Sequence, residues 1–290
     1  PPMIRLLALC LLVCAGPAGA VAVHGHRGSR GTRPENTLAA FAEALRVGVD
    51  VLELDLSVTK DDVLVVAHDP LVSPELCLGP KGEKLAAPVA IRTLTLMEVK
   101  AYDCGTLANP RFPRQRPSAG EMIPTLDDVF ALVAASTAPA AARVEFNIET
   151  KIAPSHPELF PTPERFVELV AAAVRKRGLG PRVILQSFDH RTLRAMRPLM
   201  PEIRLSALTS DNALNYALLA KDLGAAIVSP DREWIMAADV TALHAAGVQV
   251  APWTANDEAE WSRLLAMGVD AIITDYPEDL IAYLRRRKLK

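Results

Sequence analysis

Two histidines lie close together near the start of the chain, in the stretch HGHRGSRGTRPENT that runs from His24 to Thr37. Three arginines and three glycines accompany them. Glycine-rich backbone and basic side chains suit a phosphate group, and an imidazole exchanges protons near neutral pH. The spacing of the glycines does not match the nucleotide-binding fingerprints. The stretch therefore predicts a loop that forms half of an active site acting on a phosphate ester, with Arg30 and Arg33 unassigned.

Carboxylates alternate with leucines in VLELDLSV, at residues 51–58. Glu53 and Asp55 are two residues apart, so they project from the same face of a strand. In FNIETK, Glu149 occupies the corresponding position of a later strand. Like charges this close repel one another unless a cation neutralises them, and three hard oxygen ligands suit Ca²⁺ or Mg²⁺. The alternative is a set of rim carboxylates bonded to arginine or to backbone amides.

A lysine and a further histidine complete this set. Lys151 shares a face with Glu149 and is expected to hold a phosphate oxygen above the cation, although it could simply balance the carboxylates. His68 follows VLVVA at the end of a short hairpin. With His26 it would flank the carboxylates, one imidazole accepting a proton and the other supplying one. His24 lies on the same side as His26 but deeper along its strand, and is the second candidate.

Alternating strands and helices would bring these residues together. Eight strands are predicted at 21–25, 51–58, 143–151, 182–188, 203–208, 225–230, 248–254 and 270–275. A helix with Thr37 as N-cap and Gly48 as C-cap follows the first, and others are predicted near 163–177, 191–198, 211–223, 236–246 and 256–267. Eight such units in about 250 residues predict an α/β fold, the TIM (β/α)8 barrel. A doubly wound open sheet is the alternative, but eight regular repeats favour closure.

The first 20 residues have the three parts of a secretory signal peptide: Arg5, an apolar run from Leu6 to Ala15, and the small-residue end Ala18-x-Ala20. We expect cleavage after Ala20 and a periplasmic or secreted protein. A lipoprotein anchor at Cys14 is the alternative, although Val13 is a poor residue before such a cysteine. The apolar run is too short to span a bilayer, and no other segment is a transmembrane candidate. A net charge of −2 argues against nucleic acid as the partner.

Residues 69–123 interrupt the alternation and are rich in proline and glycine. We interpret them as an insertion at the barrel mouth, within one barrel domain spanning 21–290. Cys77 and Cys104 both lie in this segment. In an oxidising compartment they would pair, closing a loop of about 28 residues worth roughly 3 kcal/mol. Two free thiols are the alternative.

The ordered motifs GHRG, PENT, LELDLSVTKDDVLVVAHD, IPTLDDVF, IETK, QSF, WT and GVDAIITDYP resemble the glycerophosphodiester phosphodiesterase family, from Gly25 to Pro277. The resemblance implies a TIM barrel whose divalent cation is held by Glu53, Asp55 and Glu149. It implies His26 and His68 as the acid/base pair and Arg27 and Lys151 on the phosphate. It also implies that Gln186, Phe188 and Trp253 line the pocket. The insertion resembles that of the periplasmic or secreted branch; Asp62 stands where the family often has glycine.

The expected activity is metal-dependent hydrolysis of glycerophosphodiesters to glycerol 3-phosphate and an alcohol. The nearest alternative is a phospholipase D-like or sphingomyelinase D-like enzyme acting on whole lipids, but the polar insertion favours small deacylated substrates. A phosphodiester-binding protein without activity is a further alternative. Paired histidines and three carboxylates exceed what binding alone requires.

Overall fold

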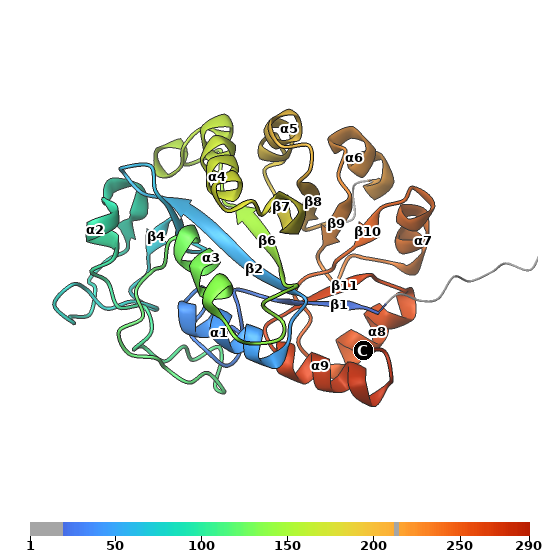
Figure 1. The fold of residues 1–290 in the computed structure, drawn as a ribbon, viewed down its shortest axis with the longest axis horizontal. Coiled ribbons are helices and arrows are strands. Elements are labelled where there is room, and N and C mark those ends of the chain that lie inside the picture. Colours follow the sequence, from blue (N-terminus) through green and yellow to red (C-terminus); the bar gives the residue numbers. More distant parts are fainter. Residues whose placement is uncertain (1–19, 212–214) are drawn as a thin grey trace, which may run out of the picture.

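Eight parallel strands form the centre of the computed structural model, which describes residues 20–211 and 215–290. Their order around the barrel is β10–β9–β8–β7–β6–β2–β1–β11 (Figure 1). The strands are β1 (Ala22–Gly25), β2 (Val51–Val58), β6 (Glu145–Thr150), β7 (Val183–Ser187), β8 (Arg204–Thr209), β9 (Ile227–Pro230), β10 (Gln249–Val250) and β11 (Ala271–Thr274). All eight predicted strands are present.

The barrel closes between β10 and β11 through backbone hydrogen bonds rather than a regular ladder. The N–H of Asp270 donates to the carbonyl of Val250 at 3.0 Å, and that of Ile273 donates to Pro252 at 3.0 Å. The strand predicted over 248–254 is reduced to two residues because Pro252 has no N–H to continue the pairing. Closure confirms the predicted TIM barrel and excludes the open sheet.

In the described part of the chain, eight helices surround the strands (Figure 1). They are α1 (Leu38–Val47), α3 (Leu126–Ala135), α4 (Pro163–Arg177), α5 (His190–Leu199), α6 (Tyr216–Leu223), α7 (Ala237–Ala245), α8 (Glu258–Met267) and α9 (Pro277–Arg286). As predicted, the Thr37 side chain accepts from the N–H of Ala40, and Gly48 ends α1 at φ 92°. The helix predicted from residue 211 begins later, because the Asn215 side chain caps it.

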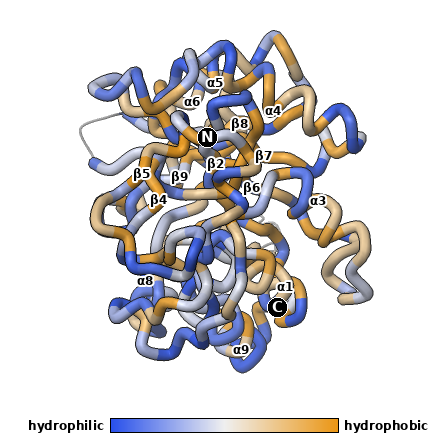
Figure 2. Tube along the Cα trace, turned by 90° about the vertical axis from the view of Figure 1, so that its left-hand side faces the viewer, coloured by the Kyte–Doolittle hydropathy of each residue, from blue (hydrophilic) through white to orange (hydrophobic). Residues whose placement is uncertain are grey.

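Strand β2 separates an apolar layer from a polar interior. Leu52, Leu54 and Leu56 are fully buried and pack in the layer between the strands and the helices. Apolar segments accordingly concentrate around the strands, and polar ones towards the outside (Figure 2). The alternate residues Glu53 and Asp55 point into the barrel. The two-residue period thus supplies both the core and the polar interior.

The segment between β2 and α3 carries its own small core. β3 (Leu64–Val66) pairs antiparallel with β2, and β4 (Leu71–Val72) pairs with β5 (Val89–Ala90). The 3₁₀ turn η1 (Ile91–Thr93) and the short helix α2 (Leu96–Val99) follow; η2 (Pro157–Leu159) and η3 (Gly180–Arg182) lie later in the chain. Cys77 and Cys104 form a disulfide, as predicted.

The first 19 residues, with the predicted signal peptide and Cys14, lie outside the described part of the chain. Among the described residues, no helix has both the length and the apolar character needed to cross a bilayer.

Candidate active site

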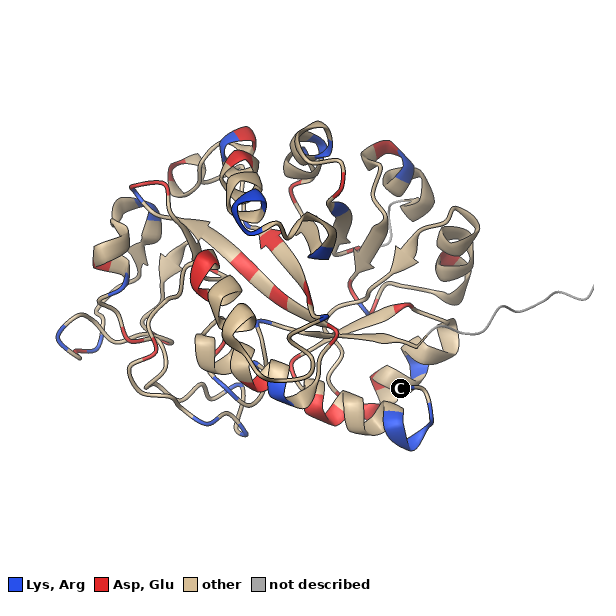
Figure 3. Ribbon diagram, viewed as in Figure 1, with Lys and Arg blue, Asp and Glu red and all other residues tan. Residues whose placement is uncertain are grey.

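Three carboxylates meet inside the barrel at neighbouring strands. Asp55 of β2 lies opposite Glu149 of β6 in the parallel register, and Glu53 lies two residues before Asp55. Acidic positions on the central strands are red in Figure 3. Each of the three offers an oxygen within 4.8 Å of the others, and all three are buried. The register of two adjacent strands therefore gathers residues that are almost 100 positions apart in the sequence.

Electrostatics of this cluster fit a bound cation. Burial and the nearby charges of Asp55 and Glu149 raise the pKa of Glu53 well above its usual range. Burial likewise raises the pKa of Glu149. For Asp55, burial is outweighed by the charges of Lys151 and Arg27, so its pKa is lowered well below normal. Excess negative charge among hard oxygen donors is the condition that a divalent cation relieves.

Arg27 contributes its backbone and its side chain. Its N–H donates to Glu53 Oε2 at 2.9 Å, its Nη1 donates to Glu35 at 2.6 Å, and its Nε lies 3.3 Å from Asp55. The backbone turns here through positive φ, 50° at Arg27 and 86° at Gly28. A Cβ at Gly28 would lie 2.6 Å from the backbone of Ala40, so only glycine fits this close approach.

Lys151 follows β6 directly and lies over the carboxylates. Its Nζ is 2.6 Å from Glu149 Oε1 and 3.3 Å from Asp55 Oδ1. Burial alone would lower its pKa, but these two carboxylates raise it. The side chain therefore stays a cation beside the trio, as the sequence predicts.

His26 is held by a carboxylate that the sequence analysis did not assign. Its Nδ1 lies 2.6 Å from Asp275 Oδ1, and Asn256 Nδ2 donates to Asp275 Oδ2 at 2.8 Å. Burial opposes ionisation of Asp275, but the charge and hydrogen bond of His26 outweigh it and lower the Asp275 pKa to about 2. Burial lowers the pKa of His26. An ionised Asp275 thus accepts from Nδ1–H, leaving Nε2 of a neutral imidazole free, 4.0 Å from Glu53.

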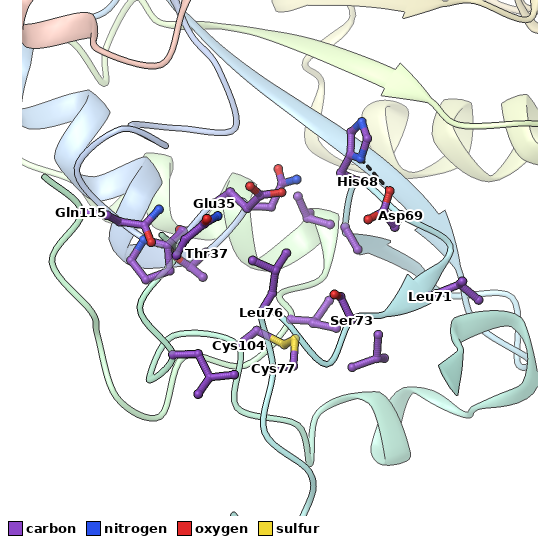
Figure 4. Close-up of a pocket in the computed structure, with 18 residues that line it drawn as sticks. Glu35, Thr37, His68, Asp69, Leu71, Ser73, Leu76, Cys77, Cys104 and Gln115 are labelled. Atoms are coloured by element: carbon purple, nitrogen blue, oxygen red, sulfur yellow. Dashed lines mark hydrogen bonds and ion pairs between the residues drawn. A yellow bond between two sulfur atoms is a disulfide. The ribbon is translucent and has the colours of Figure 1, made fainter. Parts of the chain in front are cut away.

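His68 follows the β2–β3 hairpin on the other side of the trio. Its Nδ1 is 2.8 Å from the Asp69 carboxylate (Figure 4). This pair is open to solvent, with side-chain exposures of 32% for His68 and 57% for Asp69. The two histidines therefore have similar carboxylate partners in very different surroundings.

The residues predicted on later strands form the far wall of the same cavity, which has a volume of about 170 Å³. Gln186 donates to Glu53 Oε1 at 2.8 Å, so it holds a carboxylate of the trio as well as lining the cavity. Phe188 and Trp253 meet edge to face with ring centroids 5.4 Å apart. Nine of the ten residues predicted for catalysis, metal or substrate binding line this cavity. The tenth, Asp55, does not line it but is clustered with Glu53 and Glu149.

Three polar residues at this site were missed as functional residues. Glu35 bridges Arg27 and Arg30, and Asn36 donates to Asp55 at 2.9 Å. Neither has a periodicity that could have revealed it, because both lie in an irregular loop. Asp275 had a usable signal: it directly follows the apolar run AIIT, just as Lys151 follows its own strand.

The comparisons with known proteins agree with this site. Residues 26–279 match the glycerophosphoryl diester phosphodiesterase family. A glycerophosphodiester phosphodiesterase of Caldanaerobacter subterraneus subsp. tengcongensis is 33% identical over 91% of this chain and 98% of its own. A crystal structure of a putative glycerophosphoryl diester phosphodiesterase from Silicibacter pomeroyi has a TM-score of 0.82 at 30% identity, covering 89% of this chain and 91% of that one.

An Oleispira antarctica phosphodiesterase, solved in complex with the product sn-glycerol-3-phosphate, shares the fold with a TM-score of 0.74 at 24% identity. The alignment of the two structures covers 91% of this chain and 96% of the Oleispira antarctica chain. The chain belongs to the glycerophosphoryl diester phosphodiesterase family and is a phosphoric diester hydrolase.

Proposed function

We propose that the chain hydrolyses small glycerophosphodiesters to glycerol 3-phosphate and an alcohol, with His26 and His68 transferring the protons. One observation carries this proposal: two imidazoles, three cationic side chains and two of the three clustered carboxylates line a single cavity at the barrel mouth, and the third carboxylate, Asp55, is clustered with the other two. Family membership supports the substrate class.

Glu53, Asp55 and Glu149 would hold one divalent cation, Ca²⁺ or Mg²⁺, since all three donors are carboxylate oxygens. When bound, such a cation offsets the negative charge that develops on phosphate oxygens. Asn36 and Gln186 keep Asp55 and Glu53 in place through their amide hydrogen bonds.

Arg27 and Lys151 would contact the phosphate oxygens, because both are cations that line the cavity beside the carboxylates. One imidazole accepts the proton of the attacking oxygen as the new P–O bond forms. The other donates a proton to the alcohol oxygen as its P–O bond breaks. The free Nε2 of His26 and the exposed ring of His68 are on hand for these two transfers.

The test is product formation from glycerophosphocholine, glycerophosphoethanolamine and glycerophosphoglycerol, measured after EDTA treatment and after readdition of Ca²⁺ or Mg²⁺. We expect no release of glycerol 3-phosphate without metal and full recovery with one of the two cations. Intact lipid dispersions, assayed in parallel, test the lipid-directed alternative. Faster hydrolysis of intact lipid, or binding without product under every condition, would overturn the proposal.

We also propose that the protein is exported to the periplasm or secreted. The Cys77–Cys104 disulfide supports this, because such bonds persist in oxidising compartments. N-terminal sequencing of the protein from a fractionated native host should give Val21 as the first residue. A protein that keeps residues 1–20 in the cytoplasmic fraction would contradict the proposal.

A further inference from the structure

A second cavity lies against the catalytic one, between the insertion and the first βα loop. His68 lines both cavities, and Glu35, which lines the second, holds Arg27 of the first. Figure 4 shows Glu35 and His68 along one rim and Leu76 with the Cys77–Cys104 disulfide across from them. We call this cavity the insertion chamber.

Apolar side chains make up most of the chamber wall, in contrast to the catalytic cavity. They include Leu71, Val72, Leu76, Leu107 and Ile123, together with the disulfide. The chamber volume is about 50 Å³, which is room for about four water-sized groups. A short aliphatic chain fits such a space. The charged residues of the wall are already paired, Glu35 with Arg27 and His68 with Asp69, so a charged ligand group would lose its hydration there without gaining a free partner.

Two buried amide groups in the chamber wall each have one atom without a hydrogen-bond partner among the described residues. Asn109 is 6% exposed; its Oδ1 accepts from the N–H of Arg111, which leaves Nδ2 as an unused donor. Asn36 is 4% exposed; its Nδ2 donates to Asp55, which leaves Oδ1 as an unused acceptor. Buried polar atoms are rarely left unpaired, so one unused donor and one unused acceptor on residues of this wall point to a ligand hydroxyl.

We propose that the insertion chamber binds the leaving alcohol, and that it selects uncharged alcohols with a short aliphatic chain ending in a hydroxyl group. This inference rests on the proposed function. A phosphodiester carries two substituents, and the two cavities that share His68 offer one place to each. The glycerophosphate occupies the charged cavity beside Arg27 and Lys151, and the alcohol extends past His68 into the chamber.

The experiment measures kcat/KM for synthetic methyl, ethyl, n-propyl and 3-hydroxypropyl esters of glycerol 3-phosphate, with glycerophosphoethanolamine as the cationic arm. Each methylene buried in the chamber should raise kcat/KM about fourfold. The 3-hydroxypropyl ester should be at least as good as the propyl ester, and the ethanolamine ester worse than both.

Leu76→Phe fills the chamber, so it should abolish the preference for propyl over methyl. Leu107→Phe, at another residue of the chamber lining, is the second variant in case the first does not fold. Leu218→Phe is the matched control, since Leu218 is 63% exposed on α6 and lines neither cavity. It should keep the wild-type preference.

Equal kcat/KM across the alkyl series, or a chain-length preference that survives in both chamber variants, would overturn the inference while the proposed function stands. A 3-hydroxypropyl ester more than tenfold worse than propyl would contradict the hydroxyl assignment. Absence of hydrolysis for every ester, methyl included, would instead contradict the proposed function and this inference with it.

Discussion

His24 of β1 and His26, which directly follows this strand, are the same residue type two positions apart, yet they lie in two different regions of the barrel. His24 is 3% exposed inside the barrel, where Asn147 Nδ2 lies 3.4 Å from its Nδ1 and the ring lines a cavity separate from the catalytic one. His26 lies at the open mouth, where it pairs with Asp275 and lines the cavity. Burial lowers the pKa of both, that of His24 to about 4.

The difference between them is one of access rather than of residue chemistry. β1 is paired on both sides, with β2 and β11, and its inward-facing His24 lines a separate cavity with Glu145 and Arg204 rather than the catalytic one. At the mouth, the strand has ended and the loops supply charged partners. The chemistry of this barrel therefore depends on how far along a strand a residue stands.

The sharpest test of this comparison substitutes each histidine by asparagine. His26→Asn should lower kcat about 1,000-fold with the fold intact, because it removes one of the two proton-transfer groups. His24→Asn should keep kcat within a few-fold. Steady-state kinetics measure kcat of the two variants, and circular dichroism melts test whether each is folded. Equal losses of kcat in the two variants would contradict the difference between the two regions.

A second comparison concerns the mouth segment, which is cross-linked, and the barrel, which is held by packing. Replacing Cys77 and Cys104 together by serine should lower the free energy of unfolding by roughly 3 kcal/mol, since the open chain gains the entropy of a loop closed over 27 residues. Guanidinium unfolding measures this. The wild type under reducing agent is the control and should unfold at the same midpoint as the double variant. If both unfold at the midpoint of the oxidised wild type, packing alone holds the segment.

The buried histidine at the centre should make stability depend on pH. In the unfolded chain His24 titrates near 6.5, whereas in the fold its pKa is about 4. As the pH falls, the unfolded state therefore binds the proton first. The free energy of unfolding should decrease by about 3 kcal/mol between pH 6.5 and pH 4. His24→Asn should show a shallower loss over this window in urea unfolding, and parallel profiles for the two proteins would contradict the assignment.

The sequence predicts the fold well because the signals are local and repeated. Leu52, Leu54 and Leu56 alternate with polar residues, and Thr37 and Gly48 mark the ends of α1, so each element can be recognised on its own. The carboxylate trio was predictable for the same reason, since Glu53, Asp55 and Glu149 stand on strands. Glu35, Asn36 and Asn109 were not, because their partners are fixed only by the path of irregular loops.

The two mouth histidines differ in their carboxylate partners: Asp275, which pairs with His26, is buried, whereas Asp69, which pairs with His68, is exposed. Asp275→Asn should lower kcat by about tenfold to a hundredfold with KM nearly unchanged, because an amide there no longer enforces the tautomer with a free Nε2. Asp69→Asn should cost only a few-fold, since water can replace a partner that is 57% exposed.

The pH profile distinguishes this positioning role from a merely structural one. The Asp275 carboxylate raises the pKa of His26 against the effect of burial. Asp275→Asn should therefore move the acidic limb of the kcat–pH profile to lower pH, because the His26 imidazole then stays neutral down to a lower pH. Asp69→Asn should leave that limb in place, since Asp69 does not contact His26. An unshifted limb in Asp275→Asn would mean that His26 does not act as the base, and the acid and base roles of the two histidines would have to be exchanged.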